Sequence, residues 1–180
     1  MKNLITTLVL GAAALGSAHA VTYQAAVPEK SAITFSYKQM GVAMDGKFKK
    51  FSAQVNLDTA KLDKAKGTID IDLASIDTGS SEADQEVVGK AWFNVAAHPK
   101  ASFVLKALKP AGTNQYEALG QLTIKGQTRD LKAPFKLSPQ GQLTGSFVLR
   151  RADFGIGEGM WAKFDVVANE ITVNFNLNLK

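Results

Sequence analysis

Cysteine is absent from the 180 residues of this chain. Its absence excludes disulfide bonds, thiolate chemistry and the attachment of a lipid to an N-terminal cysteine. Long apolar runs are scarce as well. The longest, from Leu4 to Gly16, is shorter than the about 20 residues that a membrane-spanning helix needs. We therefore expect neither a lipid anchor nor a transmembrane anchor.

Residues 1–20 have the layout of a secretory signal peptide. Lys2 precedes the apolar run, and Ala18-His19-Ala20 has the small-x-small form that signal peptidase recognises. We predict cleavage after Ala20, which would leave residues 21–180 as one exported domain and lower the net charge from +5 to +4. The free signal peptide and the missing cysteines favour a periplasmic location.

Patterns that support catalysis or metal binding are few. His98 is the one histidine of the exported part, and it lies in a turn-like stretch where a surface or capping role is more common than a catalytic one. Glu82, Asp84 and Glu86 could supply oxygen ligands to a cation, although a solvated helix face is their more common role. A Gly-rich phosphate loop, a serine nucleophile elbow and paired zinc ligands are all missing. We expect no catalytic residue, no metal and no cofactor.

Nucleic-acid motifs are missing too. The chain has no basic arm, zinc-finger spacing or aromatic RNA-binding motif, so we expect no nucleic-acid partner. The mild basic excess suits anionic membrane surfaces or head groups, but it is more often a soluble surface without any partner.

Alternation of apolar and polar residues is what the chain has in abundance. In segment 171–179, every second residue from Ile171 to Leu179 is apolar. A period of two places one face of a strand in an apolar interior and the other in water. Comparable segments lie around residues 23–27, 33–37, 51–57, 69–73, 103–105, 116–124, 131–137 and 143–149.

These segments, joined by short turns, predict an all-β protein of about eight strands that closes into an antiparallel β-barrel wide enough for one small ligand. We interpret residues 41–46 as a turn. Phe48 is out of phase with segment 51–57, which indicates a bulge or bend. Small residues on the predicted inward faces slightly favour an open lumen, namely Ala53, Ala118, Gly120, Ala133 and Gly145.

Segment 80–92 lacks the alternation and predicts a short helix near one end of the barrel. Ser81 is its expected N-cap, and acidic residues in the first turn oppose the helix dipole. The side chains that would face the protein are Val87, Val88, Trp92 and Phe93. Such a helix can close a barrel mouth, and ordinary packing over an open barrel end explains it equally well.

Segment 155–161 carries three glycines spaced by two, without the helix that a phosphate-binding loop requires. A flexible or tightly turned loop is the default interpretation. The functional alternative is a portal loop in which Met160 and Trp161 contact lipid or membrane.

Seven motifs in a fixed order extend over nearly the whole exported part: SAITF (31–35), GKF (46–48), SIDTG (75–79), WF (92–93), PKASF (99–103), GQLTIKGQT (120–128) and RADFGIG (151–157). In these motifs the chain resembles the YceI-like family of exported polyisoprenoid-binding proteins. It departs from the commonest family pattern at residues 82–86, where EADQE replaces an Arg-Asp-x-His-Leu stretch.

The resemblance implies an extended lipocalin-like barrel whose lumen holds a long amphiphilic isoprenoid, such as an isoprenoid quinone or a polyprenyl phosphate. We therefore hypothesise a periplasmic carrier or storage protein with an isoprenoid lipid as partner, transient membrane contact and an undecided pairing into homodimers. The expected lumen contacts are Phe35, Tyr37, Phe51, Val55, Ile71, Trp92, Phe103, Leu105, Ile124, Phe135, Phe147, Phe154, Trp161 and Phe175.

Two alternatives belong to other classes. The first is a non-catalytic envelope stress or interaction protein whose barrel is filled by its own side chains. The second is an enzyme that uses His98 or the acidic residues of segment 82–86. Leucine in place of Ala118 or Ala133 would fill a lumen and spare the fold, and unchanged lipid binding in such a variant would count against this placement of the pocket.

Overall fold

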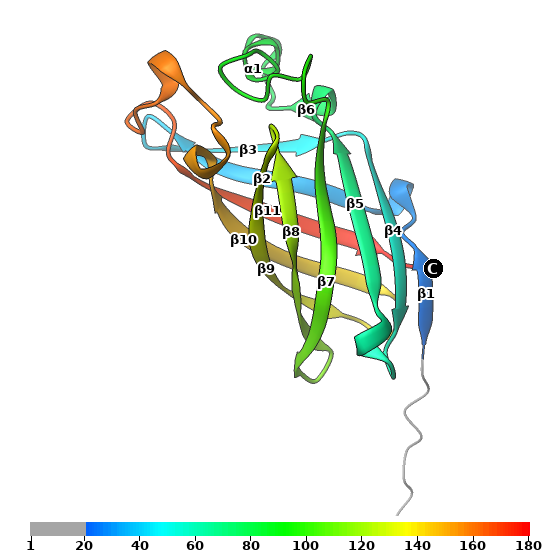
Figure 1. Ribbon diagram of the computed structural model, residues 1–180. Helices are drawn as coiled ribbons and strands as arrows, with labels where there is room; N and C mark the ends of the chain where they lie inside the picture. Colours follow the sequence, from blue (N-terminus) through cyan, green and yellow to red (C-terminus); the bar gives the residue numbers. More distant parts are fainter. Residues whose placement is uncertain (1–20) are drawn as a thin grey trace, which may run out of the picture.

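The structure is a computed structural model that describes residues 21–180, so the predicted signal peptide lies outside the described residues (Figure 1). These residues form a single antiparallel sheet that curls upon itself, in the order β1-β4-β5-β7-β8-β9-β10-β11-β2-β3-β6. Its strands are β1 (Thr22–Ala25), β2 (Ala32–Gln39), β3 (Val42–Phe48), β4 (Phe51–Asp58), β5 (Lys66–Asp72), β6 (Ile76–Asp77), β7 (Lys100–Gly112), β8 (Gln115–Ile124), β9 (Gln127–Leu137), β10 (Gln142–Arg150) and β11 (Glu170–Asn178).

The all-β barrel class is confirmed, and the strand count is higher than the sequence predicted. Each of the two edge strands of the curled sheet, β1 and β6, is joined to the rest of the sheet by backbone contacts near one end of the barrel. Beyond β1, Ala26 forms an antiparallel bridge with Leu179. The other edge strand, β6, pairs with β3, and the Lys49 backbone N–H donates to the Ser75 carbonyl at 3.0 Å.

Strand β3 corrects the interpretation of residues 41–46 as a turn. The turn comprises only Met40 and Gly41, both with positive φ, and the chain then pairs with β2 as far as Phe48. Phe48 is out of phase with β4 because it ends a different strand. Of the expected bulge or bend, the structure has the bend, at the corner between β3 and β4. The two-residue β6 is too short to show alternation.

Three phenylalanine rings of the interior lie over glycines of neighbouring strands. A Cβ built on the glycine would overlap the ring in each pair: Phe35 over Gly46, Phe103 over Gly120 and Phe175 over Gly145. Glycine inside a strand often marks such a close approach. Gly46 therefore interrupts the sequence pattern of β3 without interrupting the strand.

Replacing Gly145 with alanine is expected to lower the free energy of unfolding by about 1–3 kcal/mol, because the new methyl group would overlap the Phe175 ring and the Pro134 carbonyl. Urea denaturation measures this loss. Gly67→Ala is the matched control, because a Cβ there meets Leu105 Cβ at 3.5 Å, an ordinary contact. Equal losses in both variants would contradict the packing argument.

The described residues contain one α-helix, α1 (Ser81–Val87), which lies over one end of the barrel (Figure 1). Its N-cap is Ser80 and not the predicted Ser81: the Ser80 hydroxyl accepts from the Ala83 backbone N–H. Short 3-10 helices cover Pro28–Lys30, Leu62–Lys64, Leu73–Ser75, Arg151–Phe154 and Gly159–Trp161. None of the helices in residues 21–180 is long and apolar enough to cross a membrane.

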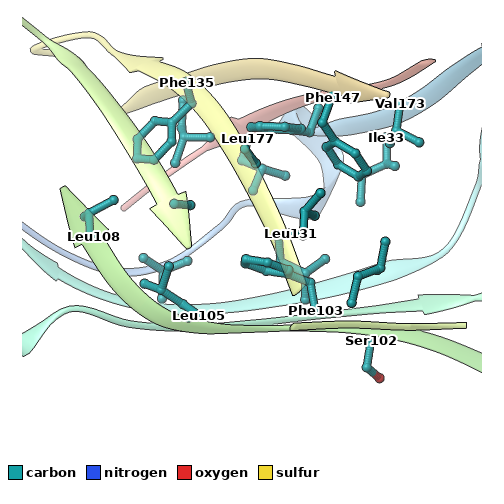
Figure 2. A pocket seen from close by; sticks show the side chains of 18 of the residues that line it. Ile33, Ser102, Phe103, Leu105, Leu108, Leu131, Phe135, Phe147, Val173 and Leu177 are labelled. Atoms are coloured by element: carbon teal, nitrogen blue, oxygen red, sulfur yellow. The ribbon is translucent and has the colours of Figure 1, made fainter. Parts of the chain in front are cut away.

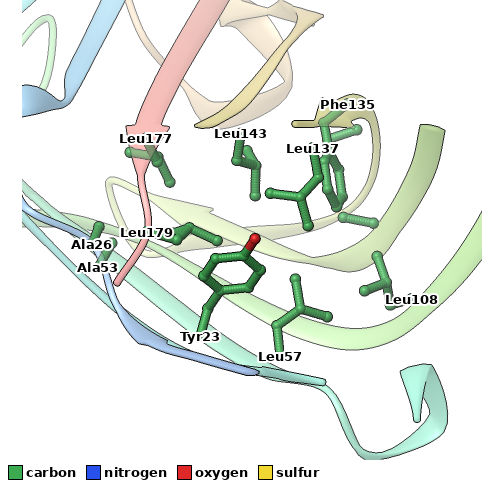
Figure 3. Close-up of a cluster of buried hydrophobic side chains, with 12 residues drawn as sticks. Tyr23, Ala26, Ala53, Leu57, Leu108, Phe135, Leu137, Leu143, Leu177 and Leu179 are labelled. Atoms are coloured by element: carbon green, nitrogen blue, oxygen red, sulfur yellow. The ribbon is translucent and has the colours of Figure 1, made fainter. Parts of the chain in front are cut away.

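The barrel end away from α1 is closed by a packed cluster. Tyr23 of β1 points into the barrel among leucines from five other segments (Figure 3). The cluster comprises Tyr23, Ala26, Ala53, Leu57, Leu108, Ala118, Ala133, Phe135, Leu137, Leu143, Leu177 and Leu179. The free space inside the barrel therefore lies between this cluster and α1.

Candidate ligand-binding cavity

The inner cavity lies within the barrel and has a volume of about 130 Å³. Alternation brings apolar side chains from eight strands to face it, and Figure 2 shows Phe103, Leu105, Phe135 and Phe147 around it. Ser102, although near its wall, points away from the other labelled side chains, and its hydroxyl donates to Asp70 Oδ1 at 2.6 Å. The inner cavity is therefore almost entirely apolar and suits hydrocarbon.

The helix-end cavity lies between the barrel and α1 and has a volume of about 410 Å³. Exposed Glu82 and Glu86 of α1 form part of its wall, so it reaches the protein surface beside the helix. Its remaining wall is mostly apolar: Phe35, Tyr37, Gln39, Phe48, Ile71, Leu73, Ile76, Thr78, Ala83, Val87, Trp92, Phe93, Ala101, Leu122, Ile124, Phe147, Leu149, Arg151, Ile156, Trp161, Val167, Ile171 and Val173.

The two cavities adjoin. Five residues belong to both walls, namely Ile71, Ala101, Leu122, Phe147 and Val173. Together the cavities form one elongated apolar interior that reaches the surface near α1 and ends against the packed cluster of Figure 3. This shape fits a ligand with a long apolar tail and a polar head.

Most of the expected lumen contacts line this interior. The inner cavity has Val55, Phe103, Leu105, Phe135 and Phe175; the helix-end cavity has Phe35, Tyr37, Trp92, Ile124 and Trp161; Ile71 and Phe147 line both. Contact of these side chains with a ligand stays a prediction.

Phe51 and Phe154 line neither cavity. Phe51 is the first residue of β4, directly after the corner, and contributes to a separate crevice beside Lys49 and Lys50. Phe154 belongs to a 3-10 helix after the end of β10 and is buried in side-chain packing. Phe51 is in phase with the inward residues of β4, but it packs against the cluster of Figure 3 and not against either cavity. Phe154 lies beyond the end of β10, where alternation does not apply.

Arg151 is the functional-site residue that the sequence reasoning missed. Its side chain is 1% exposed, although it carries a charge. Each guanidinium nitrogen donates to backbone carbonyl oxygens at 2.7–3.2 Å, and the acceptors belong to Ile156, Gly157, Trp161, Lys163, Val167 and Ala168. Arg151 thus holds the segment that follows β10 in a closed fold. The signal was available, because alternation along β10 through Phe147 and Leu149 places residue 151 on the inward face.

The buried guanidinium is paired with carbonyl dipoles and not with a carboxylate. Burial lowers the pKa of Arg151, yet arginine stays protonated at physiological pH. Its charge also lies 5.4 Å from the Trp92 ring centroid. Gly157 has φ +79°, and a Cβ there would overlap the Arg151 guanidinium, so this position requires glycine.

Trp161 connects the segment after β10 to α1. Its indole Nε1–H donates to Glu86 Oε1 at 2.8 Å, and its ring lies 5.3 Å from that of Trp92. Trp161 is therefore part of the cavity wall. Its neighbour Met160 is 85% exposed, so the two residues of the predicted portal face different surroundings.

The polar side chains in the wall of the helix-end cavity are acidic or neutral, apart from Arg151. Asp84 accepts from the backbone N–H and the hydroxyl of Thr78, both at 2.8 Å. Burial, with a smaller contribution from Asp84, raises the pKa of Tyr37. Trp92 Nε1 is buried without a hydrogen-bond partner among the described residues. The acidic residues of α1 therefore differ in role: Asp84 and Glu86 hold neighbouring segments, while Glu82 is exposed at the cavity edge.

The residues of the enzyme alternative are not brought together. His98 is half-buried and lines neither cavity. Within residues 21–180, no group of three or more His, Asp or Glu side chains is placed to hold a metal ion.

Comparisons with known proteins agree with this fold. The YceI-like domain model matches residues 24–179. A UPF0312 protein of Azotobacter vinelandii is 25% identical over 169 residues, which cover 87% of this chain and 88% of the relative. The crystal structure of Burkholderia cenocepacia BcnA superimposes with a TM-score of 0.81 and 37% identity, and the match covers 84% of this chain and 98% of BcnA.

A more distant structure has the same fold. It is described as a polyisoprenoid binding domain from Saccharophagus degradans, implicated in plant cell wall breakdown. It matches with a TM-score of 0.63 and 15% identity over 88% of this chain and 97% of the domain.

Proposed function

The chain belongs to the YceI-like family, and on that premise we propose that it is a non-catalytic periplasmic carrier that shelters the tail of a long-chain isoprenoid. The observation that carries this proposal is the elongated apolar interior formed by the two adjoining cavities. The helix-end cavity alone has the size of common ligand pockets, about 300–1,000 Å³. The Saccharophagus degradans domain, described as polyisoprenoid-binding, has the same fold.

The energetics favour a long hydrocarbon tail. Burial of each methylene group contributes about 0.8 kcal/mol, so a few isoprene units outweigh the cost of ordering the tail. A barrel filled by its own side chains would not leave this space beside Ala118 and Ala133, both of which line the inner cavity.

We further propose that the head group is neutral, as in an isoprenoid quinone, and not a phosphate. Glu82 and Glu86 line the cavity where it reaches the surface, and like charges would repel a phosphate. The one cation in the wall, Arg151, already donates from every guanidinium nitrogen to the backbone. A quinone carbonyl could instead accept from a neutral donor such as Trp92 Nε1, which has no partner in residues 21–180.

The direct test is lipid extraction. The full chain is expressed in a host with a cell envelope, purified from the periplasm without detergent, and extracted with organic solvent for mass spectrometry. We expect a stoichiometric isoprenoid. Clean extracts from folded protein, together with no uptake of added quinone, would overturn the carrier proposal and favour the interaction protein.

Removing the negative charges of Glu82 and Glu86 tests whether the cavity disfavours a phosphate head group. The double variant E82Q/E86Q is expected to improve binding of a polyprenyl phosphate by about three- to tenfold, because two carboxylates near a surface phosphate each cost on the order of 1 kcal/mol or less. Glutamine can still accept from Trp161. Quinone affinity should not change, and E117Q, on β8, is the control. Equal phosphate affinity in all three proteins would refute the charge argument.

A further inference from the structure

Exposed apolar side chains gather at one edge of the helix-end cavity. Of the eight large apolar residues that are exposed in the described part, five lie in two short segments, and we call these five the rim patch: Met40, Val42, Met160, Phe164 and Val166. Met160 is 85% exposed, Met40 74% and Val42 62%. Single exposed apolar residues are ordinary on a protein surface, but a group of them marks an interaction site.

Backbone contacts join the two segments. The Met40 N–H donates to the Val166 carbonyl at 2.7 Å, and Gln39 forms a bridge with Val167. The rim patch is also continuous with the cavity, because Gln39 and Val167 line the helix-end cavity while their neighbours Met40 and Val166 are exposed. A ligand that leaves a bilayer at the rim patch would pass into the helix-end cavity along apolar side chains, without crossing water.

The charges around the rim patch balance. Exposed Lys38 and Asp45 flank the first segment, and exposed Lys163 and Asp165 lie in the second. A surface of this kind has no strong field to attract anionic lipid, and its binding would depend on the apolar side chains. Methionine, valine and phenylalanine in loops can enter the interfacial region of a bilayer without backbone rearrangement.

We propose that the rim patch docks the protein on the surface of a lipid bilayer, in a manner that depends little on anionic lipid or on salt. The idea that a ligand enters the protein through the docked rim patch rests on the proposed function. The docking itself requires only the rim patch and the bilayer, so the two can fail separately.

Flotation with phosphatidylcholine vesicles free of isoprenoid tests the docking. Wild-type protein is expected to float with the vesicles, equally at low and high salt. The variant M40S/V42S/M160S, which leaves the Phe164 ring on Arg151 in place, should lose binding by about tenfold or more, because binding scales with the apolar area that is buried. The matched control V104S/V148S removes exposed valines from strands β7 and β10 on the barrel wall and should float like wild type.

The alternatives give other results. No flotation of wild type, or equal loss in the control, would overturn the docking proposal. Light scattering tests for a dimer. If wild type is a dimer and the rim variant a monomer, the rim patch binds a second copy of the chain, and the docking proposal is overturned as well. Uptake of quinone from detergent solution, measured on the same variants, tests the carrier function apart from docking: the rim variant should still load.

Discussion

Replacing Arg151 with methionine is expected to lower the free energy of unfolding by about 3–5 kcal/mol, because several buried carbonyl groups would lose their donor at once. Methionine keeps much of the aliphatic volume, so the loss reports the hydrogen bonds rather than a cavity. The acceptors span residues 156–168, and their joint release should loosen the whole segment that follows β10.

Denaturant unfolding measures the loss, and hydrogen exchange of residues 156–168 locates it. Arg150→Met is the matched control: Arg150 is exposed, and its one ion pair within residues 21–180 is with Asp153, at 3.1 Å, so its removal should cost about 1 kcal/mol or less. Lysine at position 151 should be intermediate, because an ammonium group has three donors and no planar fork. A stability of the methionine variant within about 1 kcal/mol of wild type would contradict the role of Arg151 as the centre of this segment.

Filling the inner cavity is expected to have the largest effect on cargo. Ala118 and Ala133 pair across β8 and β9, and both are buried against the inner cavity. Leucine at both positions would occupy the space of the distal tail. If about three carbons of the tail lose their burial, binding of a long-chain quinone should weaken by roughly 2–3 kcal/mol, or about 30- to 150-fold in Kd.

A quinone titration followed by intrinsic tryptophan fluorescence measures the change, since Trp92 and Trp161 line the helix-end cavity. A short-tailed quinone that stays in the helix-end cavity should bind the variant and the wild type alike. Ala107→Leu, on the exposed face of β7, is the control for the substitution itself. Unchanged affinity for the long-chain quinone would show that the tail does not reach the inner cavity.

The strands were predictable where side chains alternate without interruption. In β11 and β8 the pattern extends along the strand, and the predicted and observed segments agree closely. Strand β3 was not predictable in this way. Gly41 and Gly46 look like turn residues in sequence, and only the position of the Phe35 ring shows why Gly46 belongs inside a strand.

The walls of the candidate site followed from the same alternation. Residues such as Val55, Phe103 and Phe175 line a cavity because inward-facing positions of a curled sheet must face its interior. Phe154 could not be placed in this way because it lies beyond the end of β10, where alternation no longer applies. Arg151 was overlooked for a different reason: its charge argues against burial unless its donors are satisfied, and the carbonyl groups that satisfy them belong to a loop whose path the sequence does not specify.

The class of this protein was predictable from its residues alone: two-faced strands with an apolar inside, one short helix and no recognisable catalytic motif. Alternation is a local property, so it can be read without knowing which strands are neighbours. The folded chain was needed to show how far the interior is filled, where it reaches the surface and which exposed apolar residues meet at its edge. These features depend on strand register and on the sum of side-chain volumes across the barrel, which bring together residues as distant in the chain as Met40 and Val166.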